Sequence, residues 1–232
     1  MHNEDELIFA KTPAKNRANK FTFTEDQMKA YNGLIKFINE PYNPKDFKRA
    51  LIGAGGTGKT FLLKALLQDC NIPFSEIGLS APSHKACRVL RNSIMGTHCN
   101  VNTIQSDFGF KPNYDIEKFD INNVTFASYG RIKIEDYRLY IVDESSMLNR
   151  SLVTYIDKMM KKYSIKLILC GDDAQIPPVN ERDSYAFKGV KSFRLTQIVR
   201  QDEDNPIREL TNLLRNDVYN GTFNFLNYIA NT

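Results

Sequence analysis

Long hydrophobic runs are missing from this sequence. Its 232 residues contain no stretch of about 18 apolar residues, so no membrane-spanning helix is predicted. The first 20 residues are polar and lack the apolar core of a signal peptide, so export is not expected. Because residues 1–20 carry scattered lysine and arginine without periodicity, they are predicted to form a flexible basic leader.

Cysteine is scarce, and its spacing is typical of neither a disulfide framework nor a zinc site. The four cysteines are Cys70, Cys87, Cys99 and Cys170. His84 and His98 lie near two of them, but the spacing fits no usual zinc pattern. We expect free thiols and a reducing intracellular compartment, such as the cytoplasm of a bacterial or phage-infected cell.

Internal repeats and low-complexity tracts are also absent. The composition, 42% hydrophobic and 25% charged, is that of an ordinary globular protein with one well-buried core. A second domain of about 100–150 residues does not fit behind the first. The net charge of +4 is compatible with a polyanionic partner but does not require one.

Short apolar strands alternate with amphipathic helices along the chain. A first helix is predicted to begin at Thr24 and to end before Pro41. Its apolar positions are Met28, Tyr31, Leu34, Ile35 and Ile38. Strands are predicted at 50–52, directly before 81, at 139–142 and at 167–170, and helices at 61–67, 85–94, 152–160 and 206–214. This alternation predicts an α/β fold with a parallel sheet covered on both faces.

The strand at 50–52 runs into a glycine-rich turn. The turn, Gly53-Ala54-Gly55-Gly56-Thr57-Gly58-Lys59-Thr60, matches the pattern G-x-x-x-x-G-K-[ST] in full. Glycines allow backbone N–H groups to converge on phosphates, and the following helix adds its positive dipole end. The pattern predicts that Lys59 binds the β- and γ-phosphates of ATP and that the Thr60 hydroxyl ligates Mg²⁺.

Two further strand ends carry polar side chains suited to hydrolysis. Asp143 and Glu144 follow the strand at 139–142, where Asp143 would hold Mg²⁺ and Glu144 would activate the attacking water. Taken alone, such a pair could also be a helix cap. Gln175 follows the strand at 167–170, within Gly171-Asp172-Asp173-Ala174-Gln175-Ile176-Pro177-Pro178-Val179. A glutamine there can contact both the γ-phosphate and the water.

Together these motifs resemble the RecD/Dda branch of superfamily-1 helicases, over roughly residues 21–221. The most specific pieces are Asp143-Glu144-Ser145-Ser146-Met147 and the turn that ends in Gln175-Ile176-Pro177-Pro178-Val179. The resemblance implies a RecA-like ATPase domain at residues 21–200, MgATP as cofactor, and single-stranded DNA as partner. It also implies 5′-to-3′ movement along DNA and a monomeric protein.

The resemblance assigns roles to other residues. Gln27, within Thr24-Glu25-Asp26-Gln27, would read adenine, although the same residues also form a capping box. The stretch Pro82-Ser83-His84-Lys85 would grip single-stranded DNA, and its alternative is a plain helix cap at Ser83. Thr103 and Gln105 would make further DNA contacts, with Gln105 standing where the family usually has histidine.

The resemblance also assigns roles to two features later in the chain, and each of them has a simpler alternative. The insertion at residues 106–136 occupies the place of a strand-separating hairpin, where Phe126 or Tyr129 could stack on a base or belong to a surface loop. Arg200, within Leu195-Thr196-Gln197-Ile198-Val199-Arg200-Gln201, would act as an arginine finger or be a surface arginine.

A second RecA-like domain is part of the family pattern and is not found in this sequence. Residues 201–232 are expected to begin the connection to it, and the chain is expected to be a piece of a larger helicase or a shortened relative. We therefore expect nucleotide binding, weak hydrolysis and no strand separation by this chain alone. The alternatives are another P-loop enzyme, such as a small-molecule kinase, or a nucleotide-dependent DNA-binding module without turnover.

Overall fold

Six parallel strands form the centre of the molecule. The strands are β1 (Lys48–Gly53), β2 (Ile77–Ala81), β3 (Asn100–Thr103), β4 (Leu139–Val142), β5 (Lys166–Gly171) and β6 (Ser192–Leu195). They lie in the order β3-β2-β4-β5-β1-β6, and each neighbouring pair is parallel. This computed structural model describes residues 21–110, 131–175, 178, 181, 184–199 and 206–230.

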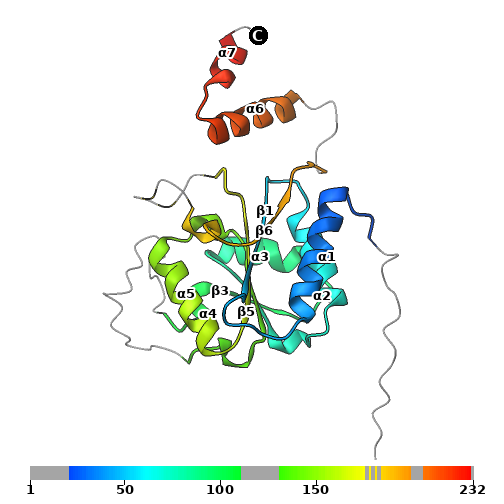
Figure 1. Ribbon diagram of the computed structural model, residues 1–232, viewed down its shortest axis with the longest axis vertical. Helices are drawn as coiled ribbons and strands as arrows, with labels where there is room; N and C mark the ends of the chain where they lie inside the picture. Colours follow the sequence, from blue (N-terminus) through cyan, green and yellow to red (C-terminus); the bar gives the residue numbers. More distant parts are fainter. Residues whose placement is uncertain are drawn as a thin grey trace, which may run out of the picture.

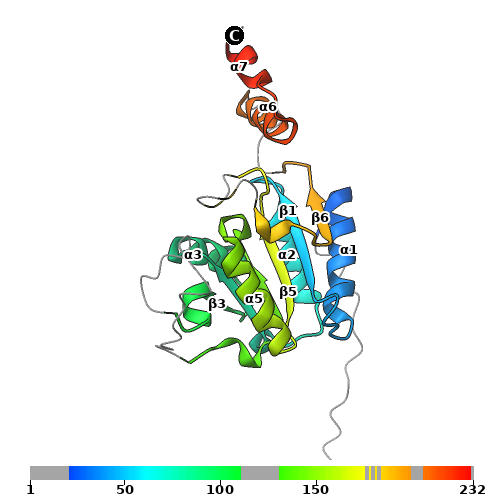
Figure 2. The same ribbon diagram turned by 60° about the vertical axis from the view of Figure 1, so that its left-hand side comes forward.

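Helices cover both faces of the sheet (Figure 1, Figure 2). They are α1 (Glu25–Asn39), α2 (Lys59–Asp69), α3 (His84–Ser93), α4 (Ile104–Asp107), α5 (Arg150–Lys162), α6 (Pro206–Asn220) and α7 (Asn224–Ala230). Short 3₁₀ turns are η2 (Phe74–Glu76), η4 (Ile134–Asp136), η5 (Ser145–Met147) and η6 (Tyr185–Phe187). The predicted α/β architecture with a parallel sheet is confirmed. Among the residues described, no helix is long and apolar enough to cross a membrane.

Side chains alternate between two apolar clusters on the two faces of the sheet. Along β4, Leu139 and Ile141 join the cluster that α1, α2 and α3 cover, whereas Tyr140 and Val142 join the cluster that α5 covers. All four of these residues are fully buried. A strand buried on both faces reads as a continuous apolar run, which is why the sequence predicted β4 correctly.

Helix α1 begins where the sequence predicted, but its buried face is rotated from the predicted one. Thr24 is the N-cap and forms a complete capping box with Gln27. The predicted face included Met28, which is instead 43% exposed, while Gln27 is buried. The reason is that the Gln27 amide is held inside by hydrogen bonds, so the buried stripe passes through Gln27, Ala30 and Leu34.

A buried lysine fastens the other end of α1 to the sheet. Lys166, at the start of β5, donates through Nζ to the carbonyl oxygens of Phe37 at 2.7 Å and Ile38 at 2.8 Å, and also to that of Glu40. Carbonyls at a helix C-terminus carry partial negative charge and otherwise lack partners, so an ammonium group suits them. Burial lowers the pKa of Lys166. This contact fixes α1 relative to β5.

Helices α6 and α7 lie beyond one end of the sheet, outside the layered body (Figure 1, Figure 2). Helix α6 is longer than the predicted 206–214, and α7 was not predicted. Phe223, Leu226 and Ile229 in this region are more than half exposed. The loops that follow β1, β4 and β5 face the same end as α6, and these loops hold the candidate site.

Candidate functional site

The glycine-rich turn between β1 and α2 is tightly wound. Gly56 and Gly58 have φ values of 83° and 85°, in the left-handed region that favours glycine. A Cβ at Gly58 would also lie 2.6 Å from Nε2 of Gln27. The Thr57 hydroxyl donates to the Ala54 carbonyl at 2.9 Å and closes the turn. The predicted cradle is therefore a compact turn at the N-terminus of α2, where backbone N–H groups and the helix dipole suit an anion.

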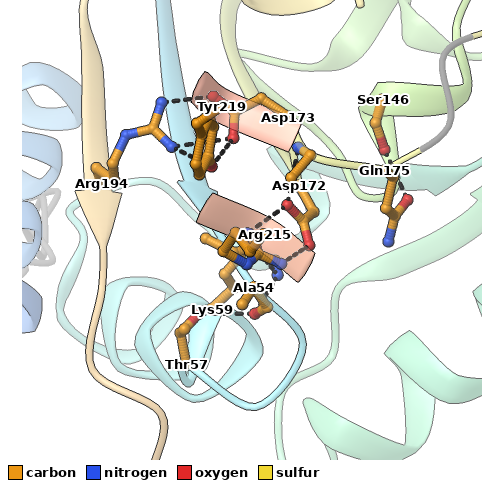
Figure 3. Close-up of polar contacts among 12 residues, drawn as sticks. Ala54, Thr57, Lys59, Ser146, Asp172, Asp173, Gln175, Arg194, Arg215 and Tyr219 are labelled. Atoms are coloured by element: carbon orange, nitrogen blue, oxygen red, sulfur yellow. Dashed lines mark hydrogen bonds and ion pairs between the residues drawn. The ribbon is translucent and has the colours of Figure 1, made fainter. Parts of the chain in front are cut away.

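Lys59, the first residue of α2, folds back over this turn. Its Nζ donates to the carbonyl oxygens of Gly53 at 2.7 Å and Ala54 at 3.0 Å (Figure 3). Thr60 follows it in the first turn of the helix. The ammonium group thus lies at the start of the turn, at the carboxyl end of β1. The backbone N–H groups that are predicted to bind phosphate belong to the same turn.

Two acidic residues follow β4 on a strained piece of backbone. The Asp143 N–H donates to the Ser80 carbonyl of β2 at 2.8 Å, so Asp143 is fixed by the sheet. Glu144 has φ 53° and ψ 37°, a left-handed conformation that is unfavourable for a residue with a side chain. Such backbone costs about 1–3 kcal/mol and persists where the surrounding structure holds it. It turns the chain sharply, directly after the strand.

The electrostatics of the acidic pair suit a divalent cation. Burial raises the pKa of the Asp143 carboxyl, and the neighbouring Glu144 charge raises it further, while Lys59 lowers it. The thiol of Cys170, at the end of β5, is fully buried, and this burial is the largest cause of its raised pKa. The charges of Asp143, Glu144 and Lys59 also act on that thiol. Because β5 lies between β1 and β4 in the sheet, the predicted cradle lysine and the predicted acidic pair lie on the two sides of the end of β5.

The turn after β5 lies between these two groups because β5 is between β1 and β4 in the sheet. The hydroxyl of Ser146, beside the acidic pair, donates to Oε1 of Gln175 at 3.0 Å (Figure 3). Gln175 is thus linked to the loop that carries Glu144. This arrangement matches what a sensor of the nucleotide state would need, and that role stays a prediction.

Two aspartates of the same turn bind arginines that the sequence did not single out. Asp172, which is 4% exposed, accepts two hydrogen bonds from Arg215 of α6, at 2.8 and 2.6 Å. Asp173 accepts two from Arg194 of β6, at 2.9 and 2.5 Å, and one from the Tyr219 hydroxyl at 2.7 Å. Figure 3 shows both pairs above the glycine-rich turn. Helix α6 is therefore held against the turn that carries Gln175.

Gln27 serves the capping box and the cradle together. Its Oε1 accepts from the Thr24 N–H at 3.0 Å, and its Nε2 donates to the Thr57 carbonyl at 2.9 Å. The capping role is thereby confirmed. The second contact ties α1 to the glycine-rich turn, and the adenine-reading role stays a prediction.

The loops predicted to bind DNA meet at one edge. Ala81 at the end of β2 is in register with Thr103 at the end of β3, so the two loops begin side by side. Ser83, His84 and Lys85 are exposed at the N-terminus of α3, whereas Pro82 is buried. Ser83 also caps α3 by accepting the Ala86 N–H at 3.2 Å, which confirms that alternative.

Other residues predicted to bind DNA are less accessible or lie elsewhere. Thr103 is buried and caps α4 by accepting the Ser106 N–H at 3.2 Å, and Gln105 is half-buried. Phe126 and Arg200 lie outside the described residues. The same holds for residues 1–20 and for most of the 106–136 insertion.

Comparison with known proteins identifies the family. A family model described as an AAA domain matches residues 36–228. The chain belongs to this family. The match includes the glycine-rich turn, the acidic pair, the turn after β5 and helix α6.

Individual relatives confirm the resemblance to superfamily-1 helicases. Protein R530 of Acanthamoeba polyphaga mimivirus, which is uncharacterized, is 27% identical over 217 residues, covering 84% of this chain and 42% of that protein. The ATP-dependent RecD2 DNA helicase of Deinococcus radiodurans is 30% identical over 159 residues, covering 68% of this chain and 20% of the helicase.

A solved structure shares the fold. The Pif1 helicase from Bacteroides, in complex with ADP-AlF3 and single-stranded DNA, aligns with a TM-score of 0.56 and 24% identity. The alignment covers 84% of this chain and 47% of that one. The chain therefore spans less than half the length of these relatives.

Proposed function

We propose that this chain is the nucleotide-binding and hydrolysing motor domain of an ATP-dependent DNA helicase. The observation that carries the proposal is the meeting of three strand ends, which brings the Lys59 turn, the Asp143–Glu144 pair and the Gln175 turn together. Relatives that are named as DNA helicases, RecD2 among them, support the choice of this class over other P-loop enzymes.

In this proposal each side chain has one task in hydrolysis. The glycine-rich turn and Lys59 bind the phosphates, while Thr60 and Asp143 would hold Mg²⁺, which would supply positive charge beside the transferring phosphoryl group. Glu144 orients and deprotonates the attacking water. Within the described residues no three His, Cys, Asp or Glu side chains are grouped to hold a metal ion by themselves. The cation would therefore be bound together with nucleotide.

Lys59→Ala should remove most of the stabilisation that MgATP provides. At a nucleotide concentration about 100 times the Kd, wild-type protein gains about 2.7 kcal/mol in free energy of unfolding. The variant should gain much less, because it lacks the ammonium group beside the phosphates. The measurement is the Tm with and without MgATP. Lys64→Ala, on the same helix, is the control and should keep the full shift; a full shift in both variants would contradict the cradle assignment.

The helicase part of the proposal concerns DNA and a second motor domain. The Bacteroides Pif1 structure contains single-stranded DNA, and in this chain Ser83, His84 and Lys85 offer exposed hydrogen-bond donors at the end of β2. We infer that single-stranded DNA binds across the loops after β2 and β3, and that strand separation requires a second RecA-like domain. Turnover that single-stranded DNA stimulates in the two-domain protein would distinguish a helicase from a kinase.

Lys85→Ala should weaken binding to single-stranded DNA and lower its salt dependence. Each lost phosphate contact reduces the slope of log K against log salt concentration by about one. The measurement is fluorescence anisotropy with labelled oligonucleotide at several salt concentrations. Lys158→Ala removes an exposed lysine from α5 and should leave the slope unchanged. Equal slopes for Lys85→Ala and the wild type would exclude this loop as a phosphate contact.

A further inference from the structure

Asp26, at the start of α1, divides its two carboxylate oxygens between two parts of the chain. Oδ1 accepts the hydroxyl of Thr24 and the N–H of Gln27, the latter at 2.8 Å. Oδ2 accepts the Thr196 N–H at 2.5 Å, the Thr196 hydroxyl at 3.2 Å and the Gln197 N–H at 3.2 Å. One oxygen therefore serves the helix, and the other binds a loop 170 residues away.

These contacts keep the Asp26 carboxylate ionised. Burial raises its pKa, but hydrogen bonds from Thr24, Thr196, Gln197 and Gln27 outweigh burial and lower the pKa to about 2. The N-terminus of α1 favours negative charge for the same reason that any helix N-terminus does. Hydrogen bonds to an ionised acceptor are about twice as strong as neutral ones, so the loop is firmly held.

The loop that Asp26 binds, Thr196–Val199, also touches the phosphate cradle. We name these four residues the strap. It follows β6, which pairs with β1 so that Gly53 is in register with Leu195. The Val199 N–H donates to the Gly56 carbonyl at 2.9 Å, within the glycine-rich turn. The strap is thus fastened to Asp26 at its start and to the cradle at its end.

Stabilising α1 does not require the Oδ2 contacts. Thr24 and Gln27 already form a complete capping box, and Oδ1 of Asp26 adds to it. The three Oδ2 contacts all go to the strap, so their structural consequence lies with the strap and not with the helix. Their removal would free the start of a loop that contacts the cradle.

We propose that Asp26 is a positioning residue for nucleotide hydrolysis, because it holds the strap against the glycine-rich turn. This inference rests on the proposed hydrolytic function. The strap contacts Gly56 directly, so its position affects the shape of the cradle near the phosphates. Asp26 itself touches no reacting atom in this scheme and acts through the strap.

Asp26→Asn tests the proposal, with Glu25→Gln as a matched control. Asparagine keeps one acceptor oxygen and can serve α1 or the strap, but not both. Glu25 carries the same charge in the same helical turn, and its partner is the exposed Lys29. Asp26→Asn should lower kcat for ATP by about tenfold to a hundredfold, with KM and MgADP affinity within about twofold of wild type. Glu25→Gln should leave kcat unchanged.

Hydrogen exchange supplies a readout that does not depend on turnover. In Asp26→Asn the amides of Thr196 and Val199 should exchange about tenfold faster or more, while amides of α2 keep wild-type rates. The Thr196 amide loses its carboxylate acceptor, and the Val199 amide keeps the Gly56 carbonyl but lies on a strap that is no longer held at its start. Wild-type exchange at both amides, or faster exchange with unchanged kcat, would overturn the positioning role. Failure of the wild type itself to bind MgADP or to release phosphate would instead overturn the proposed function.

Discussion

Glu144→Gln should lower the rate of ATP hydrolysis by about 10²- to 10⁴-fold, the usual contribution of a general base. Glutamine has nearly the same shape as glutamate but cannot accept a proton from the attacking water. MgATP binding should survive, because the glycine-rich turn and Lys59 are unchanged. The measurements are phosphate release in single-turnover conditions and the Tm shift with MgATP.

The left-handed backbone at Glu144 makes glutamine the appropriate replacement. Both side chains carry a Cβ, so both incur the same backbone strain, and a loss of activity cannot come from relaxed backbone. Glu135→Gln changes an exposed glutamate whose contact is the Tyr163 hydroxyl, and it should keep normal turnover. If the Glu144→Gln variant hydrolysed ATP at the wild-type rate, a nucleotide-dependent binding module without turnover would be the better description.

Arg215→Gln should lower the free energy of unfolding by about 2–3 kcal/mol. Removing one partner of a buried ion pair leaves a buried charge uncompensated, which costs about 3–5 kcal/mol. The Arg215 side chain is 24% exposed and that of Asp172 only 6%, so we expect a value below this range. Denaturant unfolding measures the loss, and exchange at α6 amides should rise at the same time.

Arg138→Gln is the matched control for the ion pair. Arg138 pairs with Glu76 at 3.3 Å on the surface, with 65% of its side chain exposed. An exposed pair of this kind contributes about 0–1 kcal/mol, so this variant should unfold almost as the wild type does. Equal stabilities of the Arg215→Gln and Arg138→Gln variants would show that α6 does not rest on the turn after β5 in solution.

The interior of the sheet could be predicted from the sequence, and its edges could not. Strands β1, β4 and β5 are apolar runs because both of their faces are buried. The missed strands, β3 and β6, are the two outermost in the sheet. Asn100-Val101-Asn102-Thr103 is mostly polar, and three of the four residues in Ser192-Phe193-Arg194-Leu195 are at least partly exposed. Edge strands can carry polar residues, so hydrophobicity alone does not reveal them.

In the candidate site, motifs of neighbouring residues could be predicted from the sequence, whereas contacts between residues far apart in the chain could not. The glycine-rich turn and the acidic pair are each a contiguous stretch of sequence, so the chemistry of each could be predicted from spacing alone. The Asp172–Arg215 pair joins residues 43 apart, and Asp26 reaches its strap partner across 170 positions. Aspartate and arginine are common on surfaces, and only folding shows which of them meet. For this reason Asp26 was given no role of its own and was predicted only as part of Thr24-Glu25-Asp26-Gln27, an adenine-reading motif or a capping box.

The strand order limits what can occupy the space between β1 and β4. With β5 between them, their ends are separated by two interstrand spacings, about 9–10 Å. Among the described residues Lys59 forms no ion pair with either carboxylate and donates instead to the Gly53 and Ala54 carbonyls, although its charge lowers the pKa of Asp143. A molecule that bridges the two strand ends must present anionic oxygens toward β1 and a cation toward β4. A bare phosphate ion would leave one side unsatisfied, whereas a polyphosphate chain with its own metal ion complements both.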